Sequence, residues 1–322
     1  MQTATLEAFE TERPRLLNVA YRLTGSVVDA EDAVQDTWLR LERADADISN
    51  LQAWLTTVVS RLCLDRLGSA AKRRETYVGQ WLPEPIVTTF DATDDPLASL
   101  VRDEDARFAA LVVLEVLPPA QRVAFVLHDA FDVPFDEIAE VLDVDTANAR
   151  KLASRARKAV AEPPPPVTDE EHLAAVTRFV EAMATGDLDA IIATLHPDAI
   201  VMGDANGTTN TAVNVIHGAE KFARFYLGLM NRYGPNALEA MTPVLVNGEL
   251  GFVTFGWTGA SAKLSSPPRV AAFAVRDGKV CASYDIANPE KHAGVTLPEW
   301  GERVAPHPAP ATSSLPGSRP DA

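Results

Sequence analysis

Basic side chains gather in one short stretch of the chain, between residues 150 and 158. Every Asp and Glu between residues 107 and 161 lies at or before Asp145, so this segment is acidic first and basic at its end. Cations on one helix face can neutralise nucleic-acid phosphates, and neighbouring polar groups can contact base edges. The stretch predicts a nucleic-acid-binding surface made of Arg150, Lys151, Ser154, Arg155, Arg157 and Lys158.

The residues before this cluster predict how it is held in place. Apolar Ile138 and Ala139 belong to the inner face of a first helix, and residues 143–145 predict a turn. Asp145 or Thr146 is expected to cap a second helix, which carries the basic cluster. This pattern is typical of a helix-turn-helix, whose second helix enters a major groove. A plain helical hairpin with a solvated basic face is the alternative.

A second polar surface is expected on a helix over residues 29–41. Its helical periodicity predicts a buried stripe formed by Ala30, Val34, Trp38 and Leu41. A different face carries Asp32, Gln35, Asp36 and Leu39, and periodicity alone assigns that face to solvent. The preceding helix is expected to stop at Gly25. A following helix over residues 51–74 has a basic end that contains Arg61, Arg66, Lys72, Arg73 and Arg74.

Composition limits the classes of protein that fit. The 322 residues are 47% hydrophobic and 23% charged, as in a globular protein, and the net charge is -16. That charge argues against a uniformly basic nucleic-acid wrapper but allows a basic surface confined to one helix. Two distant cysteines predict neither a disulfide framework nor a metal site. With no membrane-length apolar run and no secretory signal, we expect a cytoplasmic protein without a membrane partner.

Proline and acidic residues divide the chain into domains. We expect helical domains at residues 1–75 and 107–161, joined by an acidic linker over residues 76–106. A proline spacer over residues 162–168 precedes a third domain at residues 169–300. The proline-rich residues 301–322 predict a disordered tail.

The third domain changes character along its length. It begins with helical periodicity and continues with strands, and the Asn247–Gly248 and Asp277–Gly278 pairs are strong hairpin signals. This order predicts an α+β fold in which antiparallel hairpins wrap on helices. The expected strands cover residues 199–202, 242–246, 251–257, 269–275 and 279–285.

Together these segments resemble the extracytoplasmic-function (ECF) sigma factors. AYRLTG at residues 20–25 and DAEDAVQDTW at residues 29–38 are similar to sigma region 2, and residues 107–160 to region 4. Residues 169–293 resemble a SnoaL-like domain of the NTF2-like cone fold. WLPEP at residues 81–85 and NPEK at residues 288–291 match the ECF group with such a fused domain. The resemblance implies a multidomain protein with two all-α sigma domains, a region 2 helical bundle and a region 4 helix-turn-helix, plus an α+β cone.

The resemblance also implies a function, namely directing core RNA polymerase to promoters in a stress response. The face with Asp32, Gln35, Asp36 and Leu39 would bind the polymerase clamp coiled coil, and the flap is a further expected contact. The −10 element would meet Asn50, Arg61, Arg66, Arg73 and Arg74. The second helix of the helix-turn-helix, with Thr146 and Asn148 added to its basic cluster, would read the −35 element. Asp143 stands where the family commonly has Gly, and Asp tolerates the left-handed conformation.

For the third domain we expect regulation in cis, in place of a separate anti-sigma factor. Lys291 is expected to pair with Glu84 or with the acidic run at residues 91–95, and Trp81 to anchor the contact. In the alternative, Trp81 packs only on its own sigma domain and the 288–291 loop is solvated. The expected interdomain residues are Trp81, Glu84, Asp204, Asn288, Pro289, Glu290 and Lys291.

An enzyme is the competing interpretation, because some proteins with the cone fold are isomerases or hydrolases. Acid/base groups in the third domain are His196, Asp204, His217, Tyr226 and Asp285. The sequence does not show that these groups converge. We therefore expect no catalytic residue, no cofactor and no metal, with an unknown small ligand in the cone left open.

Overall fold

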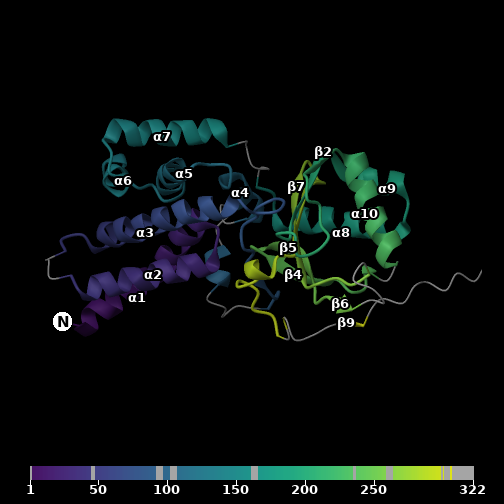
Figure 1. Cartoon of the computed structure of the whole chain (residues 1–322), viewed down its shortest axis with the longest axis horizontal. Helices are drawn as coiled ribbons and strands as arrows, with labels where there is room; N and C mark the ends of the chain where they lie inside the picture. Colours follow the sequence, from purple (N-terminus) through teal and green to yellow (C-terminus); the bar gives the residue numbers. More distant parts are fainter. Residues whose placement is uncertain are drawn as a thin grey trace, which may run out of the picture.

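The computed structural model describes residues 2–44, 48–91, 97–101, 107–160, 166–234, 237–258, 264–298, 300 and 305–306. In Figure 1 the helices of the N-terminal half lie on one side and a sheet with its own helices lies on the other. Within the described residues, no helix is both long enough and apolar enough to cross a bilayer.

Region 2 consists of three helices, α1 (Gln2–Thr24), α2 (Val27–Glu42) and α3 (Leu51–Arg74). Gly25 separates α1 from α2 with a φ of +66°, which only glycine adopts readily. The Ser26 side chain then caps α2 by accepting a hydrogen bond from the Asp29 amide at 3.1 Å. The predicted stripe of α2 is buried at Ala30, Val34 and Leu41 and half-buried at Trp38.

Region 4 contains α4 (Phe108–Leu114), α5 (Pro119–Phe125), α6 (Phe135–Leu142) and α7 (Thr146–Ala159). A π-helical turn over Val126–Ala130 follows α5. Helix α3 of region 2 packs against α5 and α6, and the apolar residues of the two regions join in a common cluster. Regions 2 and 4 therefore lie against each other, as Figure 1 shows for α3 and the helices above it.

The C-terminal domain is built on a curved sheet with α8 (Asp169–Thr185), α9 (Leu188–Ala193) and α10 (Ala219–Tyr233) beside it (Figure 1). In the described residues the sheet runs in the order β1-β4-β5-β7-β8-β2-β3. Its strands are β1 (Val87–Thr88), β2 (Leu195–Asp204), β3 (Ile216–His217), β4 (Thr242–Val246), β5 (Glu249–Thr254), β7 (Arg269–Arg276) and β8 (Lys279–Ile286). Both predicted hairpin turns form, with left-handed Asn247 and Asp277.

The fold class expected from the sequence is confirmed: two helical domains precede an α+β domain. Three details differ from the prediction. Strand β2 pairs with β8 in parallel, so the sheet is not made only of antiparallel hairpins. Helix α10 was not predicted. The linker contributes β1, which pairs with β4 at the edge of the sheet.

The proline spacer and the C-terminal tail are described only in part. Residues 161–165 of the expected proline spacer and residues 301–304 and 307–322 of the expected tail lie outside the described residues. Within the tail, β9 (Ala305–Pro306) pairs in parallel with β6 (Trp257–Thr258), so these two residues belong to a short second sheet. Thr168 caps α8 by accepting from the Glu171 amide at 3.2 Å.

Candidate nucleic-acid interface and interdomain contact

Helices α6 and α7 form the predicted helix-turn-helix. Asp143 ends α6 with a φ of +53°, the left-handed conformation expected for the turn. Asp145, rather than Thr146, caps α7 by accepting from the Asn148 amide at 2.7 Å. Small residues make close packing possible, because Ala149, Ala153 and Ala156 are fully buried along the inner side of α7.

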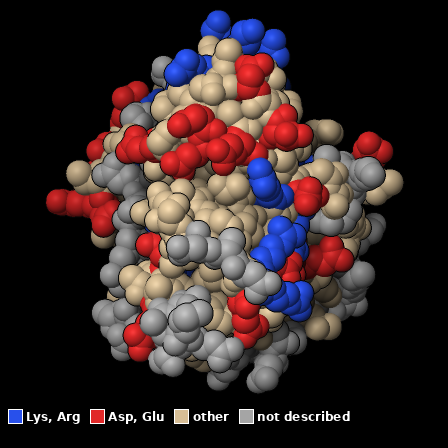
Figure 2. Space-filling model, turned by 90° about the vertical axis from the view of Figure 1, so that its left-hand side faces the viewer, with Lys and Arg blue, Asp and Glu red and all other residues tan. Residues whose placement is uncertain are grey.

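The opposite side of α7 is exposed and basic. Figure 2 shows Lys and Arg atoms at the top of the molecule, where α7 lies in Figure 1, above a band of acidic atoms. Arg157 is paired with Asp129 through two contacts of 2.8 and 3.0 Å. Thr146 and Asn148, at the start of α7, are half-buried. The exposed members of the predicted set are Arg150, Lys151, Ser154, Arg155, Arg157 and Lys158.

The predicted polymerase-binding face lies on α2. Asp32, Gln35 and Leu39 are exposed and Asp36 is half-buried. Arg66 reaches across from α3 to Asp32 at 3.3 Å and to Asp36 at 3.1 Å. Arg66 was assigned to the −10 element, but its geometry places it among the acidic residues of α2.

The other described residues assigned to the −10 element have separate partners. Asn50 caps α3 by accepting from the Ala53 amide at 3.1 Å. Arg61 donates to the Glu140 carbonyl of α6 at 2.5 Å. Arg74 pairs with Glu115 and lies 4.7 Å from the Trp81 ring. The Arg73 side chain lies outside the described part of the chain. Arg61 and Arg74 thus contact region 4 and the linker in this structure, and Asn50 makes its contact within region 2.

The linker is held between the sigma domains and the C-terminal sheet. Glu84 donates its amide to the Gly25 carbonyl at 2.8 Å, and its carboxylate accepts from the Val27 amide at 2.7 Å. The Tyr21 hydroxyl donates to the Glu84 carbonyl at 2.6 Å and accepts from the Asn247 side chain at 3.0 Å. Asn247 was predicted only as a turn residue, yet its side chain joins region 2 to the C-terminal domain.

Lys291 and Asp204 form the centre of this interdomain contact. Both are buried, at 4% and 0% exposed, with Lys291 Nζ 3.0 Å from Asp204 Oδ2. Lys291 also donates to the Leu82 carbonyl and lies 3.6 Å from the centre of the Trp81 ring. Burial lowers the pKa of Lys291, and the Asp204 carboxylate acts in the opposite direction. We call Lys291, Asp204, Trp81, Tyr77 and Asn288 the interdomain latch.

The remaining latch contacts come from both sides of the interface. Asp204 accepts from the Leu82 amide at 2.7 Å and from the Tyr77 hydroxyl. Asn288 donates to the Tyr77 hydroxyl at 2.8 Å. Burial raises the pKa of Tyr77, and the hydrogen bond to Asp204 raises it further. The phenol therefore stays protonated and donates to Asp204.

The latch corrects the predicted partner of Lys291. Its ion-pair partner is Asp204 of its own domain, whereas the Glu84 carboxylate caps α2. Residues 92–95 of the proposed acidic run lie outside the described residues. The predicted approach of the 288–291 loop to Trp81 is present, so Trp81 does not pack only on its own domain. Pro289 and Glu290 form an exposed 3-10 turn, η5 (Pro289–Lys291).

A buried arginine that the sequence analysis missed joins the two helical domains. Arg122 is 1% exposed and donates to the carbonyls of Leu114 and Leu23, at 2.6 and 3.1 Å from its two Nη atoms. Its Nη2 also lies 3.0 Å from Glu115. An arginine in a short helix after two prolines gives no periodic signal for such a role, so only the tertiary structure identifies it.

The five acid/base candidates of the third domain do not converge. Tyr226 and Asp285 line a cavity between the sheet and α8 and α10. Asp204 belongs to the latch, His217 is exposed on β3, and His196 lies 3.9 Å from the exposed Asp277. The carboxylate of Asp285 is already paired with Arg269 at 2.5 Å. This arrangement contains no His–carboxylate pair across the cavity among the described residues.

Three family models match consecutive parts of the chain. They are Sigma-70 region 2 at residues 8–73, Sigma-70 region 4 at residues 107–160 and a SnoaL-like domain at residues 176–283. The chain is 57% identical over 294 residues to the ECF RNA polymerase sigma factor SigJ of Mycobacterium tuberculosis (strain ATCC 25618 / H37Rv). That match spans 90% of this chain and 94% of SigJ. The chain belongs to the ECF RNA polymerase sigma factors.

Another sigma factor and a crystal structure show how much of the chain the similarity covers. The probable ECF RNA polymerase sigma factor SigI of Mycobacterium tuberculosis is 37% identical over 198 residues, which is 59% of this chain and 66% of that one. The crystal structure of SigJ matches with a TM-score of 0.79 at 55% identity, covering 91% of this sigma factor and all of that chain. The likeness therefore includes the arrangement of all three domains.

Proposed function

We propose that this ECF sigma factor binds core RNA polymerase through the acidic face of α2 and reads the −35 promoter element with α7. The observation that carries the second role is the exposed cationic face of a helix that Asp145 caps and three buried alanines hold against α6. A recognition helix needs a free outer face and a fixed inner face, and α7 has both.

We further propose that the C-terminal domain regulates the sigma factor in cis through the latch. Three features support this role: β1 of the linker is a strand of the C-terminal sheet, Lys291 lies on Trp81, and Asn247 contacts Tyr21. The first two tie the linker between regions 2 and 4 to the third domain, and the third ties region 2 to it. Because the linker sets the distance between these regions, fixing it restricts the spacing at which two promoter elements can be engaged.

The packing of regions 2 and 4 favours a regulated spacing. Arg61, assigned to the −10 element, donates to Glu140 of α6, and α3 packs on α6. One side of region 2 is therefore covered by region 4 while the latch is closed. We propose that the attached domain takes the part that a separate anti-sigma factor plays elsewhere, and that it acts by contact rather than catalysis.

A run-off transcription assay with core polymerase tests the regulatory role. Lys291→Glu places an acid beside Asp204 and opens the latch, while Lys221→Glu makes the same charge change on the exposed side of α10. We expect Lys291→Glu to change promoter-directed transcription severalfold without weakening core binding, and Lys221→Glu to leave it unchanged. A change in either direction supports the proposal. Wild-type transcription from Lys291→Glu, with the open latch verified by increased proteolysis of the linker, would contradict it.

A further inference from the structure

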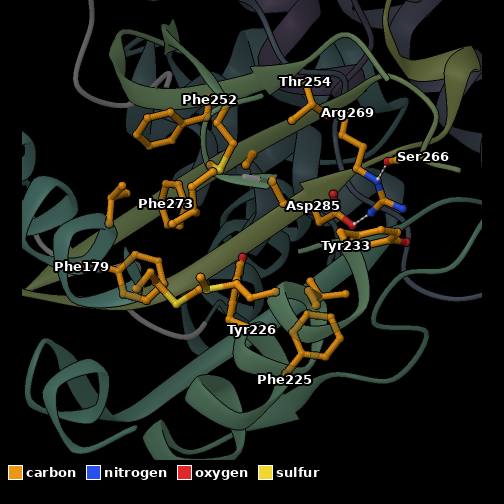
Figure 3. Close-up of a pocket in the computed structure, with 18 of the residues that line it drawn as sticks. Phe179, Phe225, Tyr226, Tyr233, Phe252, Thr254, Ser266, Arg269, Phe273 and Asp285 are labelled. Carbon is orange, nitrogen blue, oxygen red and sulfur yellow. Dashed lines mark hydrogen bonds and ion pairs between the residues drawn. The ribbon is translucent and has the colours of Figure 1, made fainter. Parts of the chain in front are cut away.

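A largely apolar cavity of about 140 Å³ lies in the C-terminal domain, between the concave face of the sheet and helices α8 and α10. Figure 3 shows aromatic rings around this space, among them Phe179, Phe252, Phe273 and Phe225, with the charged groups at one end. An apolar cavity of about 150 Å³ in another protein binds benzene. The cavity therefore has the size of a molecule built on one aromatic ring.

Strand register explains why the cavity has an apolar body and one polar end. Phe252 of β5, Ala271 of β7 and Asp285 of β8 are consecutive cross-strand partners, so they share one face of the sheet. One step along the same face, Thr254 pairs with Arg269. The polar groups of three strands are thus collected at one end, while the helices supply apolar side chains opposite them.

The polar end is electrically neutral. Arg269 pairs with Asp285 at 2.5 Å, and its remaining contacts are with the Ser266 hydroxyl at 3.1 Å and the Asn210 carbonyl at 2.6 Å. Figure 3 shows the Arg269–Asp285 pair beside Thr254. A charged ligand would lose its hydration here without gaining an unpaired counter-charge, so the pair disfavours anions and cations. An uncharged polar group has no such penalty.

One hydrogen-bonding group in the cavity wall has no partner. The Thr254 hydroxyl oxygen is buried and makes no hydrogen bond with any described residue. By contrast, the Tyr226 hydroxyl is 2.5 Å from the Ser283 hydroxyl. A buried hydroxyl without a partner is unfavourable, and a ligand with a hydroxyl or carbonyl group would satisfy it once the Thr254 side chain turns its oxygen toward the cavity.

We propose that this cavity binds a small uncharged molecule with an apolar body about the size of one aromatic ring and a single hydroxyl or carbonyl group. The body occupies the space among the aromatic side chains, and the polar group hydrogen-bonds to the Thr254 hydroxyl. We assign binding rather than catalysis to the site. The one carboxylate among its described lining residues, that of Asp285, is held by Arg269 and by the Thr211 hydroxyl at 2.7 Å.

The polar end of the cavity is connected to the latch by one short route and to the linker by another. Asp285 is followed on β8 by Ile286, which pairs with Asp204, and the Asn288 amide donates to the Asp204 carbonyl at 3.1 Å. Occupancy of the cavity is therefore placed to alter the latch, a step that rests on the proposed regulatory function of the latch. The coupling is reciprocal, so a mutation that opens the latch also alters ligand affinity.

The second route runs through the loop after β2. Thr211 contacts Asp285, and the neighbouring Asn210 carbonyl contacts Arg269. Farther along the same loop, the Val213 carbonyl accepts from the Gln80 side chain in the linker at 3.5 Å. A shift of the Arg269–Asp285 pair can thus be transmitted to the latch through β8 and to the linker through this loop.

Binding of 4-methylphenol to the full chain, measured by calorimetry, tests the site. We expect saturable binding of this neutral probe and none of 4-methylbenzoate, which has the same ring and a carboxylate. Thr254→Val should weaken binding of 4-methylphenol about fivefold, the loss of one hydrogen bond. Thr242→Val on the exposed start of β4 is the matched control and should leave binding unchanged.

A second variant keeps this test independent of the hydrogen bond. Ala271→Leu fills the cavity and should abolish binding, with circular dichroism confirming that the domain stays folded. If that variant misfolds, Met230→Trp from the α10 side fills the same space. The proposal is overturned if 4-methylphenol does not bind, if 4-methylbenzoate binds equally well, or if a folded, cavity-filled variant binds like the wild type.

Run-off transcription with and without 4-methylphenol tests the coupling. We expect the probe to change transcription by the wild type and to have no effect with Lys291→Glu. If the probe binds without any change in transcription, the proposed coupling is overturned, whereas the proposed binding site stands. If Lys291→Glu itself transcribes like the wild type, the regulatory function fails while the calorimetric result stands by itself.

Discussion

The cations of α7 and the cation of the latch, Lys291, differ in their exposure to solvent. Those on the outer face of α7 are exposed, and within the described residues Arg155 and Lys151 have no ion-pair partner. Lys291 is 4% exposed and is enclosed by Asp204, a carbonyl and an aromatic ring. Exposed cations are available to bind a partner outside the chain. A buried cation is held by its own chain and joins two of its domains.

The difference matters because water screens the two groups unequally. An exposed ion pair contributes about 0–1 kcal/mol to stability, so a surface can gather cations for binding with little effect on folding. Removing one partner of a buried pair is strongly destabilising, because the other charge is left without compensation. Substitutions on α2 and α7 should therefore affect binding alone, and substitutions in the latch should affect stability and regulation.

The largest effect is expected from reversing the acidic face of α2. Asp32→Lys combined with Asp36→Lys should abolish co-purification with core polymerase, because the exposed face changes from acidic to basic around Arg66. The free energy of unfolding should change by less than about 1 kcal/mol, since both side chains are about half exposed to solvent. Glu181→Lys with Asp198→Lys makes the same total charge change at exposed positions of the C-terminal domain. Retained co-purification of the α2 variant would refute the assignment.

Lys291→Met should have the next largest effect, on stability. It leaves Asp204 buried without its cation, so we expect the free energy of unfolding to fall by about 3 kcal/mol in urea titrations. The double variant Lys291→Met with Asp204→Asn should recover part of this loss, because no unpaired charge remains. Lys221→Met, on the exposed side of α10, should be neutral. A loss below about 1 kcal/mol for Lys291→Met would show that the latch charge behaves like a surface charge.

The sequence predicted the α7 side of this comparison much better than the latch side. Capping, turn chemistry and helical periodicity are local, so residues 134–160 were enough to predict the helix-turn-helix and the exposed basic face. Asp143 and Asp145 adopt the predicted turn and cap. The resemblance to a family supplied the loop at residues 288–291 and Trp81, but not the partner of Lys291.

The latch escaped prediction because its contacts join residues far apart in the sequence. Asn247 reaches Tyr21, and Val87 pairs with Val246, without any local signal for either contact. The parallel pairing of β2 with β8 and the cavity depend in the same way on the assembled sheet. Helix α10 had local periodicity but lies among strand signals, and it was missed. Long-range pairing is what a single sequence leaves undetermined.

Single alanine variants of α7 should affect binding more than stability. We expect the holoenzyme to bind promoter DNA more weakly with Arg150→Ala, Lys151→Ala or Arg155→Ala. Where the variant removes a base contact, the loss should be about 1–3 kcal/mol. Where a phosphate contact is lost, the salt dependence should become shallower by about one unit. Arg157→Ala should have a smaller effect because Asp129 already engages that guanidinium. Lys279→Ala is an exposed control on β8. Unchanged promoter affinity in all of the α7 variants would exclude this face as the reader.

The smallest effect is expected from a second buried charge between domains, and it appears as pH dependence. Glu249 at the start of β5 lies 3.7 Å from Arg107 of region 4 and 4.0 Å from His172 of α8. Burial raises the pKa of Glu249 to about 7, although Arg107 acts to lower it. The folded chain therefore keeps a proton that the unfolded chain loses between its ordinary pKa and about 7. Stability contributed by this group should fall as the pH rises through that window.

The variant Glu249→Gln separates this contribution from that of His172. Burial lowers the pKa of His172, so the stability that His172 contributes rises with pH. Relative to the variant, the wild type should lose on the order of 1–2 kcal/mol of unfolding free energy between pH 5 and pH 8. Thermal unfolding at a series of pH values measures the difference, with the exposed Glu239→Gln as control. Parallel pH profiles for the wild type and Glu249→Gln would show that Glu249 titrates like a surface acid. The charges in the contact between region 4 and the sheet would then be screened by solvent, like those of α7, and would not behave as buried charges like those of the latch.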